Sequence, residues 1–149
     1  MRLGVDVGSV RIGVAVSDPR GTVAVPLETV ARASRRSGAD LARLRELVQE
    51  YDAVEVVVGL PLSLSGAEGA AAEAARAFAV RLARAVAPVP LRMVDERLST
   101  VAAHRGLRAA GVTERQGRGR VDASAAAFLL QAALDAGPAP APDDPEVEA

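Results

Sequence analysis

Two apolar runs close to the N-terminus, Leu3–Val7 and Ile12–Val16, constrain the fold of this chain most strongly. β-branched residues dominate both runs, as is typical of strands. The tight link at Gly8 and Ser9 leaves room only for a turn between neighbouring strands. We therefore expect the chain to open with an antiparallel hairpin.

Asp6 is the carboxylate inside the first of these runs. Side chains alternate along a strand, so Asp6 shares its face with Gly4 and Gly8. A carboxylate in a core strand is costly unless something compensates it. Metal coordination is one compensation, for which the two glycines leave room, and hydrogen bonds from backbone amides near the turn are another. Asp6 alone does not decide between them.

The rest of the chain predicts an α/β fold with a mixed five-stranded sheet flanked by helices. Residues 22–30 read as a third strand, and Pro26 in it indicates a sheet edge or a bulge. Apolar periodicity and turn residues then place further strands at 53–58 and 91–94, a helix that opens at 37–40 with apolar residues up to Val48, and helices at 70–86, about 101–110 and about 121–136. The resulting order, β-β-β-α-β-α-β-α-α, requires the last two strands to run parallel to their neighbours. Glycines and arginines make residues 111–120 a mobile loop in this prediction.

The composition limits which metal ligands the chain can offer. It contains no cysteine and one histidine, His104, which excludes thiolate and multi-histidine sites. His104 itself reads as a partly exposed helix residue. Any metal site must therefore use oxygen ligands, which favours Mg²⁺ or Mn²⁺. Aromatic residues make up 2% of the chain, which argues against a base-stacking platform.

Three acids stand at positions that structure alone explains poorly. Asp6 lies within a strand, Glu96 follows the strand at 91–94, where open α/β sheets place ligands, and Asp122 lies in the first turn of the last predicted helix. Asp95 and Glu96 point to opposite sides of an extended backbone, so only one of them can join Asp6, and the residue pattern does not choose. Converging carboxylates repel one another unless a cation neutralises them.

Arginines lie close to two of these acids. Arg97 follows Glu96, and three more arginines precede Asp122: Arg115, Arg118 and Arg120. Guanidinium forks suit phosphate oxygens, although a solvated basic loop explains them equally well. Ser99 and Thr100 read first as helix caps, and beside Glu96 they could also touch phosphate.

The last twelve residues, Pro138–Ala149, form a proline-rich acidic tail that we expect to be disordered, after a single folded domain over residues 1–137. The tail holds four acids and no arginine, so removing it changes the formal net charge from −1 to +3. A mildly basic body fits a polyanionic partner. No signal segment or bilayer-length apolar run is present, so we expect a cytoplasmic protein with no membrane association.

Four stretches in order resemble the motifs of the YqgF/RuvX family: GVDVGSVRIGVAVSD, VVVGLPLSLSGAEG, VDERLST and RQGRGRVDASAAAFLLQAALD. The resemblance covers residues 2–135. Members of the family are described as candidate pre-16S rRNA nucleases and as proteins similar to Holliday junction resolvases. The resemblance implies a ribonuclease H-like fold, in agreement with the predicted element order.

The resemblance also assigns residues to the site. It implies that three acids occupy the metal-binding positions of a nuclease: Asp6, Glu96 and Asp122. It thereby favours Glu96 over Asp95, and it places Arg11 on a basic position suited to a phosphate contact. The chain departs from the family at residues 63–66, where Ser-Leu-Ser-Gly replaces a loop that often carries Asn and Asp.

We therefore expect a nuclease that uses Mg²⁺ or Mn²⁺ to hydrolyse phosphodiester bonds in structured nucleic acid, with RNA, as in pre-16S rRNA 5′-end processing, favoured. The expected nucleic-acid contacts are Arg11, Arg97, Ser99, Thr100, Arg118 and Arg120. The alternatives are a Holliday junction resolvase acting on DNA and a binding module without catalysis. A sugar kinase or actin-like ATPase has a similar phosphate loop, but such chains are normally much longer. A monomer and a homodimer are both compatible with the sequence.

Overall fold

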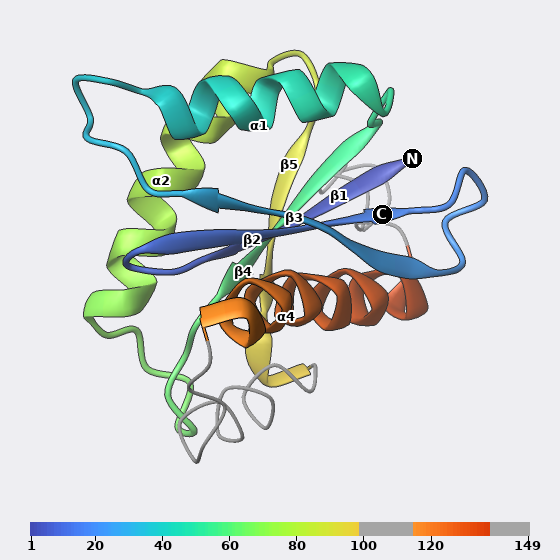
Figure 1. The fold of residues 1–149 in the computed structure, drawn as a ribbon. Helices are drawn as coiled ribbons and strands as arrows, with labels where there is room; N and C mark the ends of the chain where they lie inside the picture. The colour runs from blue at the N-terminus through green and yellow to red at the C-terminus, as the bar shows by residue number, and fades with distance from the viewer. Residues whose placement is uncertain (99–114, 138–149) are drawn as a thin grey trace, which may run out of the picture.

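The computed structural model describes residues 1–98 and 115–137. A five-stranded sheet forms its centre, in the spatial order β3-β2-β1-β4-β5 (Figure 1). The strands are β1 (Arg2–Val7), β2 (Arg11–Ser17), β3 (Ala24–Ala31), β4 (Glu55–Leu60) and β5 (Leu91–Asp95), and the helices are α1 (Ala39–Glu50), α2 (Ala70–Val86), the short 3-10 helix η1 (Glu96–Leu98) and α4 (Arg115–Ala136). The predicted mixed α/β sheet is confirmed.

The opening hairpin forms as predicted. β1 and β2 pair antiparallel from Leu3 opposite Val16 to Val7 opposite Ile12. The turn is closed by the Gly8 N–H, which donates to the carbonyl of Arg11 at 2.9 Å. β4 pairs parallel to β1, and β5 parallel to β4, as their helical connections require.

The prediction for Pro26 is also confirmed, because β3 is an edge strand and its register with β2 shifts opposite Val14 and Ala15. Proline has no N–H for the sheet ladder, so an edge with an irregular register is where a strand tolerates it.

The two faces of the sheet differ in the size of their side chains. On one face, Leu3 and Val5 of β1 are buried in a core with Phe78 and Leu82 of α2 and with residues of α1. Figure 1 shows α4 on the opposite face. There, Gly4 of β1 meets α4 so closely that a Cβ atom on it would lie 2.7 Å from Cβ of Leu130. This close approach brings α4 directly onto the face that carries Asp6.

The prediction of a loop over residues 111–120 is wrong where the structure describes it, since α4 begins at Arg115. Gly117 and Gly119 each cost about 1 kcal/mol in a helix, which is why the sequence favours a loop here. Packing of the long apolar face of α4 on the sheet, through residues such as Leu129 and Leu130, overrides that local preference. Asp122 consequently lies beyond the first turn of α4, and the helix dipole is not what places an acid there.

Several predictions fall outside the described residues: the helix at 101–110, the roles of Ser99, Thr100 and His104, and the disorder of the tail 138–149. The side chains of Arg115, Arg118 and Arg120 are likewise outside the description, although their backbone lies in α4. Among the helices that are described, none is long and apolar enough to cross a bilayer.

Candidate functional site

Asp6 lies on the central strand of the sheet, on the face that α4 covers. It pairs with Gly13 of β2, and on its other side Val5 pairs with Val58 of β4, so Gly59 comes alongside Asp6. Asp6 is 4% exposed. A buried carboxylate between two glycines is costly unless other groups compensate its charge.

The backbone of α4 at Asp122 packs on Gly13, the residue of β2 that pairs with Asp6. A Cβ atom on Gly13 would lie 1.9 Å from the carbonyl oxygen of Asp122, so α4 rests on β2 at the residue that pairs with Asp6. The Asp122 carboxylate is 4% exposed and accepts a hydrogen bond from Nε of Arg11 at 2.7 Å. Arg11, the first residue of β2, therefore neutralises this acid in the structure.

Glu96 arrives from the other side, on η1 directly after β5. A Cβ atom on Gly59 would lie 2.7 Å from Oε1 of Glu96 and 3.1 Å from its Cγ. The absence of a side chain at Gly59 is thus what admits Glu96, which is 6% exposed, to the strand beside Asp6.

The neighbouring acid, Asp95, has a different environment. Its carboxylate forms a fork with Arg97, with Nη2 at 2.6 Å and Nε at 3.0 Å from Oδ2. The Arg97 guanidinium holds the pKa of Asp95 below its ordinary value because it hydrogen-bonds the ionised form. The sequence left open which of Asp95 and Glu96 lies near Asp6. In the structure, Glu96 is the buried acid beside Gly59.

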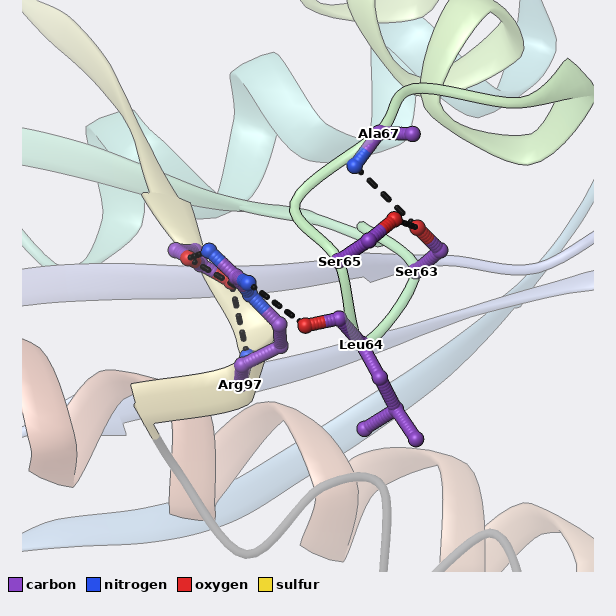
Figure 2. Close-up of polar contacts among 6 residues, drawn as sticks. Ser63, Leu64, Ser65, Ala67 and Arg97 are labelled. Carbon is purple, nitrogen blue, oxygen red and sulfur yellow. Dashed lines mark hydrogen bonds and ion pairs between the residues drawn. The ribbon is translucent and has the colours of Figure 1, made fainter.

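Arg97 also braces the loop that follows β4. Its Nη1 donates to the carbonyl of Leu64 at 3.3 Å, as Figure 2 shows. Within the loop, the Ser63 hydroxyl lies 2.9 Å from that of Ser65 and accepts from the Ala67 N–H at 3.1 Å. The loop that departs from the family pattern is thus held by its serine hydroxyls and by Arg97, and Leu64 at its tip is 97% exposed.

The three acids share one region of the sheet face, but their carboxylates are not arranged as the ligands of one ion. Within residues 1–98 and 115–137, no group of three or more His, Cys, Asp or Glu residues has the arrangement of a metal site. The donor chemistry nevertheless fits a hard cation, because buried carboxylates are oxygen ligands of the kind that Mg²⁺ and Mn²⁺ prefer. A cation at Oδ2 of Asp122 would compete with Arg11 for that oxygen.

Sequence reasoning found these acids but missed the two glycines that position them. Gly13 and Gly59 lie inside strands, where glycine is unfavourable unless another group approaches closely. That signal was available in the sequence. It does not say which residues approach, since Gly13 and Asp122 are far apart in the chain.

Comparisons with known proteins agree on the relationship of this chain. The family described as "RuvX: Holliday junction resolvase" matches residues 1–136. A protein of Streptomyces avermitilis is 54% identical over 134 residues, covering 90% of this chain and 85% of its own length, and one of Thermobifida fusca is 54% identical over 142 residues, covering 91% and 87%. Both are named as candidate pre-16S rRNA nucleases.

Solved structures of Thermus thermophilus RuvC resemble this fold. The protein alone superposes with a TM-score of 0.53 at 19% identity, covering 91% of this chain and 94% of RuvC. RuvC in complex with a Holliday junction substrate gives the same TM-score at 17% identity, covering 91% and 93%. At these identities the likeness concerns the fold, which is ribonuclease H-like as predicted.

Proposed function

This chain belongs to the RuvX family, and from that membership and the acids around Asp6 we propose that it is a divalent-metal-dependent nuclease. The substrate would be structured nucleic acid, and the names of relatives at 54% identity favour RNA of the pre-16S type. One observation carries the proposal: three buried acids from β1, η1 and α4 share one region of the sheet face.

The proposed ligands of the cation, Mg²⁺ or Mn²⁺, are Asp6, Glu96 and Asp122. When bound, the cation would supply the Lewis acidity and the charge neutralisation that phosphodiester hydrolysis requires. The chain contributes the rigid frame: Asp6 sits on the central strand, and the glycines opposite it let the other two acids approach. Rigid elements of this kind hold a site more accurately than loops do.

In this proposal Arg11 also binds substrate phosphate. It would leave Asp122 when a cation neutralises that carboxylate, and its planar guanidinium would then be available to phosphate oxygens. Arg97 has less freedom, because Asp95 and the Leu64 carbonyl already engage it. Its exposed side chain would contact the nucleic-acid backbone while it keeps the 63–66 loop in place. Ser99, Thr100, Arg118 and Arg120 stay proposed contacts on the sequence argument alone.

The test replaces Asp6 with Asn, which keeps the shape of the side chain and removes its charge. Purified wild-type and Asp6→Asn proteins are incubated with Mn²⁺ and labelled RNA. We expect cleavage to fall by a factor of about 100 or more, as for loss of a group that stabilises charge in the transition state. Asp135→Asn, a matched change on the exposed end of α4, should cleave like the wild type. Full activity of Asp6→Asn would refute the assignment.

Further measurements separate the alternatives. Circular dichroism and Mn²⁺ titration by calorimetry of the same variants distinguish lost metal binding from lost folding. Single-stranded DNA and a four-way junction, used beside the RNA, test the resolvase activity that the family description names. Symmetric junction cleavage needs two sites, so it should be accompanied by a dimer in light scattering. Salt-sensitive binding without strand scission on any substrate would identify a binding module instead.

A further inference from the structure

Three arginines gather at the opposite end of the sheet face from the glycines that admit Glu96 and Asp122. Arg2 begins β1, Arg20 lies in the turn between β2 and β3, and Arg92 lies on β5. Together with Leu134 and Gly137 at the end of α4 they line a cavity of about 210 Å³. Arg2 is four residues before Asp6 on the same strand, so the Cα atoms of the two residues lie about 13 Å apart.

The cavity carries excess positive charge. Among residues 1–98 and 115–137, its lining contains no acid, and Arg2 and Arg92 share one carboxylate, Glu55, whose oxygens lie 3.6 Å and 3.3 Å from their Nε atoms. Nε of Arg92 and Oε1 of Glu55 are buried without a hydrogen-bond partner, so this pairing is imperfect. The C-terminal end of α4 adds about half a negative charge. One carboxylate and half a dipole charge leave the three arginines under-neutralised.

The acidic tail of the chain leaves from this cavity. Gly137 is a lining residue and receives a hydrogen bond from Nη2 of Arg92 at 3.3 Å on its carbonyl. The segment 138–149 follows it directly, with four acids and no basic residue: Asp143, Asp144, Glu146 and Glu148. Asp143 is six residues beyond Gly137, so its tether extends to about 20 Å at most. A tether this short gives the acids an effective concentration of about millimolar at the cavity.

We propose that the cavity lined by Arg2, Arg20 and Arg92 is the docking site of the acidic segment 138–149 of the same chain. The carboxylates of the segment supply the charge that the arginines lack. The docked segment also masks a basic surface that would otherwise attract other polyanions. The proposal is independent of the nuclease chemistry proposed above, because none of its residues belongs to the acidic region around Asp6.

The test is a paramagnetic label on the segment, which the absence of cysteine makes simple. Val147→Cys in the full chain carries a nitroxide between two of the acids. In low salt we expect the amide signals of Arg20, Gly21 and Leu134 to be lost by broadening. They should return in 1 M NaCl, where the Debye length is about 3 Å.

Two charge changes in the labelled chain complete the test. The signals should also return when the four tail acids become Asn or Gln, and when exposed Arg20 is changed to Glu. Arg45→Glu on α1, an equal change on the other face, should leave the broadening intact. Broadening that is as strong with the neutral tail as with the acidic one, or none in the starting protein, overturns the proposal. So does a cavity whose signals shift with added inorganic phosphate while the tail label has no effect. The dispersed spectrum itself reports that each variant is folded.

Discussion

Gly13→Ala should destabilise this protein more than a glycine-to-alanine change ordinarily does. The added Cβ would lie 1.9 Å from the carbonyl oxygen of Asp122, 2.4 Å from its carbonyl carbon and 3.0 Å from the N of Ala123. All three are backbone atoms, so no side-chain rotation relieves the overlap. The start of the packed part of α4 must therefore retreat from β2 by roughly 1 Å even to reach 3.0 Å.

The size of the effect follows from what that retreat disturbs. Leu129, Leu130 and Ala126 of α4 are fully buried against the sheet, and a shift of the helix loosens their contacts together. Overpacking a core costs about 1–3 kcal/mol, and rigid backbone on both sides places this case near 3 kcal/mol or above. For a chain of 149 residues, that loss lowers Tm by about 6–12 °C.

The assay is urea unfolding followed by circular dichroism, with Gly69→Ala as the matched control. Gly69 precedes α2, has an ordinary negative φ of −105°, and a Cβ there meets nothing within 4 Å. The free energy of unfolding of Gly69→Ala should differ from that of the wild type by no more than about 1 kcal/mol. The loss of a glycine cap and the reduced freedom of the unfolded chain have opposite effects on stability. If Gly13→Ala costs no more than Gly69→Ala, the close contact of α4 with β2 is not as argued.

Two further predictions concern single carboxylates. The pKa of Asp18 is lowered to about 2 because the Val23 and Thr22 N–H groups donate to its carboxylate. Since this folded-state pKa lies below the ordinary value of 3.8, the stabilisation by Asp18 is full above pH 4 and is lost toward pH 2. Asp18→Asn should therefore flatten the pH dependence of the urea midpoint between pH 4 and 2, and an unchanged dependence would contradict this. Arg11→Gln removes the cation paired with Asp122, so it should lower stability by about 1–3 kcal/mol and tighten Mn²⁺ binding in calorimetry. Weaker Mn²⁺ binding would show that Arg11 supports the acids instead of competing for them.

Local sequence rules predicted most of the fold because the signals there are local. Alternation of β-branched residues found β1 and β2, and helical periodicity found α2 with its observed bounds, Ala70–Val86. The prediction for the start of α4 was wrong for the same reason. Gly117 and Gly119 weaken a helix locally, while tertiary packing stabilises it. Propensity describes a segment in isolation, and α4 forms against the sheet.

The sequence singles out the acids of the candidate site but does not predict how they are arranged. Asp6 and Glu96 drew attention as acids next to apolar runs, which is a local signal. The choice between Asp95 and Glu96 depends on the Arg97 fork and on the space above Gly59, and neither is visible in a pattern of residues. The family resemblance favours Glu96, and in the structure Glu96 is the acid that lies buried beside Gly59.

The arrangement of the acids depends on side chains that are absent. At Gly13 a side chain would strike the backbone of α4, whereas at Gly59 it would strike the side chains of Glu96 and Leu129. The first glycine therefore sets where the backbone of α4 lies, and the second sets where the side chains of Glu96 and Leu129 lie. Packing and site are coupled at both glycines, through the helix backbone at Gly13 and through side chains at Gly59. Because α4 is both the cover of this sheet face and the carrier of Asp122, the chain cannot move that acid without also loosening its own core.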